Sequence, residues 1–482
     1  MSEPGPQDPA PQDPGPAPAA MTEPSAPSAP LPTENASDES SGDSPERLTH
    51  WIVTLLIGLS ALMVLFHLQD SSLTNANTGS RYATIESIVD YHSYYIDKSQ
   101  YRNTIDKFQF GDHLLSSKPP ALPTYAAGVY WVYEKLTGKT IVSNEGEVVW
   151  LVSLFTGWLA HVVFLIYLYR FCQLLLKRQL AIILCVAAGA FAYLGAAYAT
   201  ALNNHSIGGA MGFVGFYYAF RIRNQLQVRT RHWIFAGLCL GFLPAVDLPS
   251  LALSGCVSLY LLSYDWKKTL LLFAPCLLPG LVVQLGLSVL TTGSLMPAYG
   301  NAELKTFSGN YFRQIKSGID ALHEPKYVYA FNALIGHHGL FSMTPLFGFS
   351  LWEMIRHWKR RDRYLPELAV VTATTLAVIV FYLWRTHNYG GWCVGMRWFV
   401  PFMPLLLLYF GLWLDRAKLS RSTWAWVLAA FLVSAFNVQD GLTSPFQFSM
   451  WNNWLEGTPN LNRIGPKMNL RRGNKPKKPR AQ

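Results

Sequence analysis

Two aspartates and a lysine stand close together in a polar stretch of a chain that is otherwise rich in apolar residues. Asp106 and Asp112 come first, and Lys118 follows directly before Pro119 and Pro120. A carboxylate within hydrogen-bond reach of a hydroxyl group can take its proton, and a cation can hold a developing negative charge. Proline restricts its own backbone and that of the residue before it, so Lys118 has a defined direction. These residue types suit acid–base chemistry beside an anion.

The elements around this stretch are predicted to lie in a membrane. Only 14% of the 482 residues are charged and 50% are hydrophobic, whereas soluble domains carry about 25% charged residues. A helix of about 20 apolar residues crosses the hydrocarbon core. Such runs lie near 50–68, 147–169, 180–201, 204–222, 232–246, 249–263, 269–291, 338–355, 366–385, 397–414 and 423–438. We therefore expect an all-α polytopic membrane protein with about 11 transmembrane helices.

Composition also divides the chain. Residues 1–46 are rich in Pro, Ala and Ser and nearly free of aromatic residues, which predicts a disordered cytoplasmic tail. Residues 47–440 form the membrane domain, and residues 441–482 form a C-terminal segment with a basic tail. The six cysteines show no CxxC spacing, and the acids are scattered. We therefore expect no cofactor and no tightly bound metal ion.

The basic residues between the spans predict which side each loop occupies, because Lys and Arg collect in cytoplasmic loops. Five clusters begin at Arg170, Arg221, Lys267, Arg356 and Arg416. All five fall on the cytoplasmic side if the segment 120–136, with its prolines and tyrosines, lies along the outer membrane surface instead of crossing. Lys118 then faces outward. Eleven spans leave the basic tail after residue 462 outside as well, so either a span is miscounted or this tail contacts anionic lipids.

This orientation places two long loops outside, residues 69–146 and 292–337. The first contains Tyr82, Ile85 and Ile88 at the spacing of an amphipathic helix on the membrane. Charged groups at a membrane edge cost free energy and are candidates for function. Candidate substrate-binding residues on this face are Arg81, Glu86, Lys118, His205, Asp247, His337, His387 and Arg397.

Each candidate also has a structural interpretation. Asp247 can cap the helix that follows it, and His337 can bond to loop carbonyls. Arg397 and Lys118 can be anchors whose charged ends reach the membrane interface. The gathering of these residues on one face favours a ligand site over the separate explanations.

The order of two tripeptides carries a resemblance to a known family. Arg81-Tyr82-Ala83 follows the first span, and Lys118-Pro119-Pro120 precedes an aromatic helix. This arrangement resembles the integral-membrane glycosyltransferases of the GT-C fold, in the bacterial branch similar to protein O-mannosyltransferases and lipid A aminoarabinose transferases. The resemblance implies transfer of a sugar, with inversion, from a polyprenyl-phosphate donor to a glycan, lipid or protein on the extracytoplasmic face of the cytoplasmic membrane. Membrane lipids are the other expected partners, and nucleic acid is not.

The chain departs from that family where catalytic acids are expected. The family usually places an acid just before the Arg-Tyr-Ala triplet, where this chain has Asn77 and its neighbours. It often places a second acid at the next outer turn, where this chain has Asn203, Asn204 and His205. Either the base comes from elsewhere or the activity is altered. We predict Asp106, with Asp112 second, because both lie in flexible polar stretches near Lys118.

Other functions remain open from the sequence alone. A lipid-linked glycan flippase or other transporter is the main alternative, followed by a glycan ligase or polymerase of another fold and by an inactive relative that acts as a scaffold. A transporter is expected to carry ionisable residues near the middle of the bilayer and broken repeats. Here the polar residues gather at one rim, which favours the transferase.

Overall fold

The computed structural model describes residues 45–69, 75–298, 304, 324–361, 363–386, 388–418 and 420–457. Apart from Pro45 and Glu46, the predicted N-terminal tail lies outside the described residues, as do His387, most of the second outer loop and the basic C-terminal tail. Everything below concerns the described residues.

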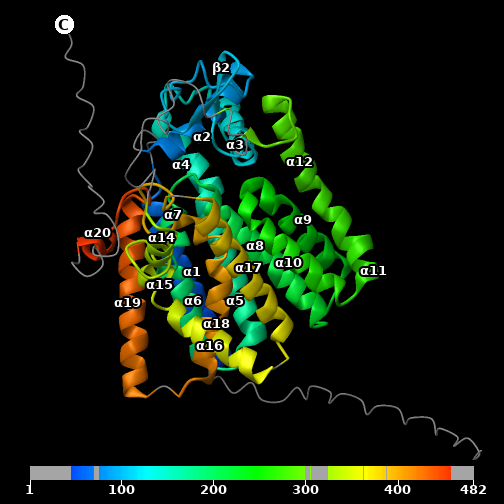
Figure 1. The fold of residues 1–482 in the computed structure, drawn as a ribbon, viewed down its shortest axis with the longest axis vertical. Coiled ribbons are helices and arrows are strands. Elements are labelled where there is room, and N and C mark those ends of the chain that lie inside the picture. Colours follow the sequence, from blue (N-terminus) through cyan, green and yellow to red (C-terminus); the bar gives the residue numbers. More distant parts are fainter. Residues whose placement is uncertain are drawn as a thin grey trace, which may run out of the picture. The chain divides into compact units, whose positions relative to one another are not determined.

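Most of the described chain forms a bundle of helices (Figure 1). In chain order these are α1 (Pro45–Phe66), α4 (Glu145–Ser153) continuing through a π-helical turn (Leu154–Trp158) into α5 (Leu159–Leu175), α6 (Gln179–Phe191), α7 (Gly195–Tyr198), α8 (Asn204–Arg223), α9 (Thr230–Val246), α10 (Leu251–Leu262), α11 (Trp266–Lys268), α12 (Ala274–Thr292), α14 (Lys326–Leu334), α15 (Leu340–Met343), α16 (Phe347–Arg360), α17 (Leu365–Arg385), α18 (Met403–Arg416), α19 (Arg421–Thr443) and α20 (Met450–Gly457). Short helical turns also occur at Leu248–Ser250, Thr269–Phe273 and Arg397–Phe399.

Several helices have the length and composition of membrane spans. Five stretches are both long and apolar enough to cross a bilayer: Pro45–Phe66, Glu145–Leu175, Trp266–Thr292, Leu365–Arg385 and Arg421–Thr443. Shorter apolar helices at Gln179–Phe191 and Leu248–Leu262 lie among them. The predicted all-α polytopic membrane protein is confirmed, while the count of about 11 spans stays a prediction.

Small residues let the central helices approach closely. A methyl group added to Gly280 of α12 would come within 2.1 Å of the carbonyl oxygen of Gly241 in α9. Gly237 of α9 similarly faces Cys276 of α12. Helices in a membrane gain little from hydrophobic exclusion and associate through such close packing. The glycines therefore bring α9 and α12 together.

The predicted basic loops share one end of the bundle. Asp415 accepts hydrogen bonds from the backbone N–H groups of Lys177 and Arg178. Buried Glu353 accepts from Arg416 at 3.0 Å and from Arg356 at 3.4 Å. These contacts join three of the five clusters at the end we call the basic end. The other end carries the elements of the first predicted outer loop and is called the cap end.

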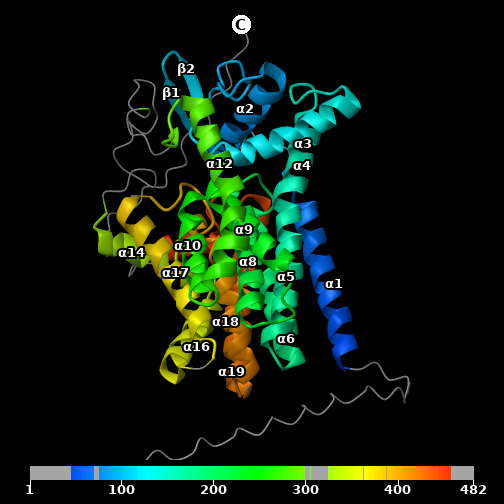
Figure 2. The same ribbon diagram turned by 90° about the vertical axis from the view of Figure 1, so that its right-hand side faces the viewer.

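At the cap end, α2 (Ala76–Tyr91), the antiparallel pair β1 (Lys107–Phe110) and β2 (His113–Ser116), and α3 (Ala121–Thr137) form a second small core. Figure 2 shows that α3 runs across the end of the bundle and not along it. This is the arrangement predicted for residues 120–136. α3 begins directly after Pro119 and Pro120, which supply the expected turn.

The helix predicted around Arg81 is present as α2, but its expected exposure is wrong. An amphipathic surface helix would turn its polar side to water, yet Asn77, Ser80, Arg81 and Glu86 are all buried. The segment between α2 and β1 folds over this polar side, where Ser99 and the backbone of Gln100 bond to Glu86. The cap end is therefore a folded layer with a polar interior.

The last described helix also lies at the cap end. In α20, Trp451 donates from Nε1 to the carbonyl oxygen of Ser342 at 3.0 Å, and Asn452 donates to the carbonyl oxygen of His337. Because α19 runs from the basic end to the cap end, Gly457 lies at the cap end. This is the same end as the first predicted outer loop, where a chain with eleven spans would leave its C-terminal tail. The tail from residue 458 lies outside the described residues.

This arrangement predicts the accessibility of two introduced cysteines. Gln109 is exposed on β1 at the cap end, and Thr230 is exposed at the start of α9 at the basic end. In intact cells, Gln109→Cys should react with a membrane-impermeant maleimide, whereas Thr230→Cys should react only after the membrane is permeabilised. The unmodified protein gives the background from its six cysteines. Labelling of Thr230→Cys from outside would reverse the predicted orientation.

Candidate active site

The β1–β2 hairpin brings Asp106 to Lys118. Lys107 pairs with Ser116 in the hairpin register, so the residues just beyond the pair are neighbours. The Nζ atom of Lys118 lies 2.7 Å from Oδ2 of Asp106, and the two side chains are 14% and 13% exposed. Burial lowers the pKa of Lys118 to about 8, although the carboxylate of Asp106 opposes this shift. A largely buried ion pair therefore joins Asp106 and Lys118.

Ser80 of α2 holds this hairpin in place. Its Oγ donates to the carbonyl oxygen of Asp106 at 2.6 Å and lies 2.6 Å from Oγ of Ser116. Ser116 in turn accepts from the backbone N–H of Lys118 at 3.2 Å. The hydroxyls of Ser80 and Ser116 therefore connect the helix that carries Arg81 to the backbone of Asp106 and of Lys118.

Arg81 is fixed by two neutral side chains. It is 2% exposed. One guanidinium nitrogen donates to the backbone and side-chain oxygens of Asn77, and the other donates to Oδ1 of Asn204 at 2.6 Å. Burial, and then the nearby Arg397, lower the pKa of Arg81. Because amides cannot neutralise a cation, Arg81 keeps a positive charge that acts on its surroundings.

Arg397 enters the same region from a glycine-rich loop. Gly390 and Gly391 have φ angles of 92° and 83°, which favour glycine. A methyl group on Gly390 would lie 3.1 Å from Cγ and Nε of Arg397, so the arginine side chain lies on the bare backbone of that residue. The loop therefore requires glycine at position 390 for its backbone and for the space that Arg397 occupies.

The guanidinium of Arg397 has no anionic partner among the described residues. The residue is 8% exposed, and its Nε atom is buried without a hydrogen-bond partner. The ring centroid of Phe446 lies 5.7 Å from the Cζ atom of Arg397. A buried cation without a counter-charge is costly, so this arrangement fits a site that an anion completes.

These groups surround a cavity of about 460 Å³, which we call the polar cavity. Its lining combines three kinds of side chain: the charged residues Asp106, Lys118 and Arg397; the amides Asn75, Asn77 and Asn388; and the aromatic residues Trp392, Trp398 and Phe446. Arg81 lies behind Asn77. The polar cavity thus holds a carboxylate, cations and apolar walls within one space.

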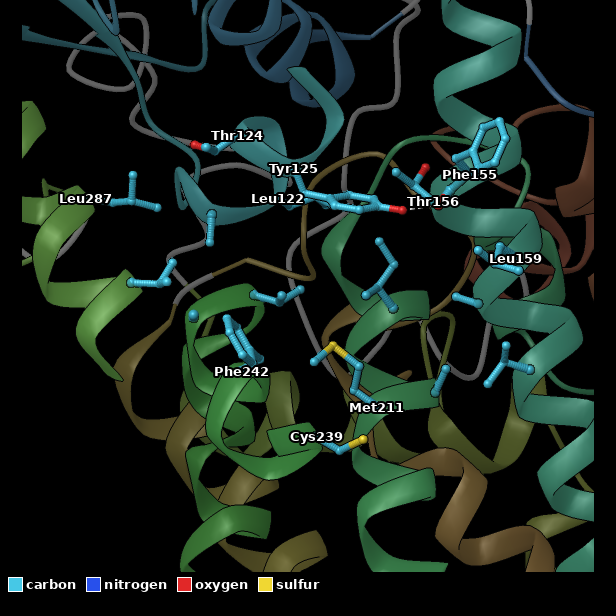
Figure 3. Close-up of a pocket in the computed structure, with 18 of the residues that line it drawn as sticks. Leu122, Thr124, Tyr125, Phe155, Thr156, Leu159, Met211, Cys239, Phe242 and Leu287 are labelled. Atoms are coloured by element: carbon cyan, nitrogen blue, oxygen red, sulfur yellow. Dashed lines mark hydrogen bonds between the residues drawn. The ribbon is translucent and has the colours of Figure 1, made fainter. Parts of the chain in front are cut away.

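A second, apolar cavity of about 710 Å³ lies beneath α3. Figure 3 shows Leu122 and Tyr125 of α3 on one side of it and Met211, Cys239 and Phe242 of α8 and α9 on the other. Leu287 and Leu290 of α12 line this cavity, while Ser288 and Thr291 of the same helix face a small gap that Lys118 also borders. Lys118 therefore borders both the polar cavity and the small gap beside α12.

His205 and Asp247 form a buried pair behind the site. Nδ1 of His205 is 3.4 Å from Oδ2 of Asp247, and both side chains are 4% exposed. Ser250 donates to the same carboxylate oxygen at 3.3 Å. Neither His205 nor Asp247 lines the polar cavity. The charge of Asp247 is nevertheless close enough to Arg81 to oppose part of the lowering of its pKa. Their predicted contact with substrate stays a prediction.

Three other candidates lie away from the polar cavity. Glu86, a candidate substrate-binding residue, is buried and accepts from Ser99 Oγ at 2.6 Å, and its contact with substrate stays a prediction. Burial raises the pKa of Glu86. Asp112 is exposed in the turn of the β1–β2 hairpin. His337 packs against Tyr389, and burial lowers its pKa to about 4.

The structure also shows site residues that the sequence analysis did not select. They are Ser80, the amides Asn75 and Asn388, and the aromatic residues Trp392, Trp398 and Phe446. The two tryptophans flank Arg397 in the sequence Gly-Gly-Trp-Cys-Val-Gly-Met-Arg-Trp. That concentration of aromatic residues and glycines around a candidate arginine was a usable signal.

The described residues offer little to a metal ion. No group of three or more His, Cys, Asp or Glu side chains is close enough together in this part of the chain to hold one. Asp106 is the carboxylate that lines the polar cavity, and it is already paired with a lysine. The expectation that no tightly bound metal is needed stays a prediction.

Comparisons with known proteins identify the fold. No family model matches this chain, and no curated protein matches it by sequence. Among solved structures, ArnT from Cupriavidus metallidurans bound to undecaprenyl phosphate is similar with a TM-score of 0.50 at 14% identity, over 79% of this chain and 62% of that one. A second similar structure is the archaeal oligosaccharyltransferase AglB from Archaeoglobus fulgidus in complex with an inhibitory peptide and a dolichol-phosphate. Its TM-score is 0.49 at 13% identity, and the match covers 86% of this chain and 59% of that one.

This chain therefore spans about three fifths of the length of the structures that it resembles. The likeness to ArnT covers the fold and not the identity of substrates. The protein has the GT-C fold of integral-membrane glycosyltransferases.

Proposed function

We propose that the protein is a glycosyltransferase that moves a sugar from a polyprenyl-phosphate donor to an acceptor on the extracytoplasmic face of the membrane. The observation that carries this proposal is the buried guanidinium of Arg397, which has no counter-charge among the described residues and borders the same cavity as Lys118. A phosphate group would supply the missing charge and accept several hydrogen bonds from the two cations.

The apolar cavity explains why the anion would be attached to a lipid. Its lining is almost entirely hydrocarbon, and it lies beneath α3 among helices α5, α8, α9 and α12. A polyprenyl chain in this space would place its phosphate beside Lys118, which borders the gap next to the apolar cavity. The similar ArnT structure is described as bound to undecaprenyl phosphate, which agrees with this class of donor.

The polar cavity would hold the reacting groups. In the proposed step, a hydroxyl oxygen of the acceptor attacks the anomeric carbon of the sugar, and the bond from that carbon to the phosphate oxygen breaks. The phosphate leaves with the electron pair, and Lys118 and Arg397 stabilise its growing charge. Asp106 accepts the proton of the acceptor hydroxyl. Attack opposite the leaving phosphate would invert the anomeric centre.

Asp106 needs a change of partner before it can act as a base. In the structure its Oδ2 atom is 2.7 Å from Nζ of Lys118, and this contact stabilises the carboxylate. A phosphate bound by Lys118 would compete for the ammonium group and leave Asp106 available to the acceptor. The same lysine can therefore bind the donor and control the base.

The first test concerns the phosphate-binding cations. Arg397→Ala and Lys118→Ala should each reduce sugar transfer about 100- to 1,000-fold, because each removes a donor to the leaving phosphate. The measurement is turnover of purified protein in liposomes with a polyprenyl-phosphate sugar. Arg385→Ala and Lys98→Ala, both at exposed positions, are the matched controls and should retain normal turnover. Normal turnover in both cavity variants would contradict the assignment.

The second test concerns the base. Asp106→Asn keeps the size of the side chain and removes its charge, so transfer should be abolished while polyprenyl-phosphate binding persists. Asp112→Asn, at the exposed hairpin turn, should behave as the wild type. If Asp112→Asn loses activity and Asp106→Asn retains it, the base is Asp112. If neither matters, the base lies on another loop, with Asp247 and His205 as the next candidates.

The third test uses the lowered pKa of Lys118, which is about 8 in the free protein. Below pH 8 the lysine is protonated and can bind an anion, and above pH 8 it loses its charge. Affinity for undecaprenyl phosphate should therefore fall as the pH rises above 8, by up to about tenfold per pH unit. Lys118→Arg should move this loss to higher pH, because arginine stays charged. An identical pH profile in both proteins would exclude Lys118 as the titrating group.

A further inference from the structure

Two tryptophans form flat apolar walls in the polar cavity. Trp392 and Trp398 both line it, on either side of Arg397 in the loop that follows α17. Each indole has one face covered by another ring. Trp392 stacks on Phe448 with centroids 4.9 Å apart, and Trp398 stacks on Tyr382 at 4.7 Å and 12°. The covering rings hold the indole planes in position, and both tryptophans line the polar cavity.

An anchoring role at the membrane interface explains these tryptophans less well. Trp384, near the end of α17, has the properties of an anchor, because it is 75% exposed and lines none of the cavities described above. Trp392 is 41% exposed and faces the space that also contains Asp106 and Arg397. Trp392 thus lines the polar cavity, whereas Trp384 does not.

Three amides in the same cavity are oriented as hydrogen-bond donors. The Oδ1 atoms of Asn75 and Asn388 accept from backbone N–H groups, of Thr78 at 2.7 Å and of Gly390 at 2.9 Å. Asn77 accepts from Arg81. With their oxygens bound inside the protein, the donors that these side chains can offer a ligand are their NH2 groups.

Flat aromatic faces beside several N–H donors match one class of ligand. A sugar ring has an apolar face of C–H groups that packs on an indole, and hydroxyl oxygens at its edge that accept hydrogen bonds. A purely hydrocarbon ligand would leave the amide NH2 groups unpaired, which costs free energy. A second phosphate would gain nothing from the two indoles.

We propose that the polar cavity binds a sugar ring against Trp392 and Trp398, with its hydroxyl groups held by Asn75, Asn77 and Asn388. This inference rests on the proposed function and adds the residues that recognise the sugar. The ring belongs either to the donor, whose phosphate is held by Lys118 and Arg397, or to an acceptor glycan that enters from the other side of Asp106. Both sources offer the same chemistry, and the test separates them.

The test measures binding to the purified full-length protein in nanodiscs. Three kinds of probe are used: undecaprenyl phosphate, undecaprenyl phosphates that carry a hexose or a pentose, and soluble trisaccharides of glucose, mannose and arabinose. The variants are Trp392→Leu and Trp398→Leu, with Trp384→Leu as the matched control. Leucine keeps an apolar side chain and removes the flat ring. Trp392→Phe and Trp398→Phe should restore part of the affinity.

If the donor sugar occupies the cavity, both leucine variants should lose about three- to tenfold in affinity for the sugar-bearing lipids and nothing for undecaprenyl phosphate. If an acceptor glycan occupies it, the same loss should appear for the trisaccharides alone. Trp384→Leu should match the wild type throughout. Unchanged binding of undecaprenyl phosphate also reports that the variants are folded.

Two results would overturn the proposal. In the first, undecaprenyl phosphate still binds, but the sugar is not recognised by the two tryptophans. Either no sugar-bearing probe binds the wild type better than its sugar-free counterpart, or the leucine variants bind every sugar as the wild type does. This leaves the phosphate site and the proposed function intact and removes the sugar site. In the second, the wild type does not bind undecaprenyl phosphate at all, which contradicts the proposed function itself.

Discussion

The burial of three cations, which costs free energy because it removes their hydration, is the constraint that shapes the cap end of this protein. Arg81, Lys118 and Arg397 all lose most of their hydration around one cavity, and among the described residues only Lys118 contacts a carboxylate there. Such charges persist only where other interactions fix them. Asn77, Asn204 and the bare backbone at Gly390 supply that support without cancelling the charge. Burial of these cations lowers the stability of the fold, and it concentrates positive charge around the polar cavity.

The local parts of this arrangement could be predicted from the sequence. Lys118 before two prolines predicted a turn followed by a helix, since proline acts on its immediate neighbours, and α3 begins there. The apolar runs predicted a polytopic helical membrane protein for a similar reason, because span length depends only on consecutive residues. The distribution of basic residues predicted that α3 crosses the end of the bundle, as Figure 2 shows.

The contacts between distant residues could not be predicted in this way. Arg81 and Asn204 are 123 positions apart, and no local pattern indicates that an amide on α8 would hold an arginine on α2. The apolar spacing of Tyr82, Ile85 and Ile88 indicated a helix, but it could not show that the polar side would be covered by the segment that precedes β1. For the same reason the sequence could not show that Glu86 bonds to Ser99 inside the cap.

Amides stand where the resemblance to GT-C glycosyltransferases leads us to expect acids, and this changes what the site can do. An acid beside Arg81 would neutralise it and could serve as the base, whereas Asn77 and Asn204 only fix its position. The carboxylate in the polar cavity then comes from Asp106, which the hairpin register places against Lys118 and which Ser80 holds through its backbone. The chain thus separates two tasks: α2 fixes a cation, and the hairpin supplies the carboxylate. Under the proposed function, a base that is paired with the phosphate-binding lysine would become available only when a donor competes for that lysine, which would couple proton transfer to donor binding.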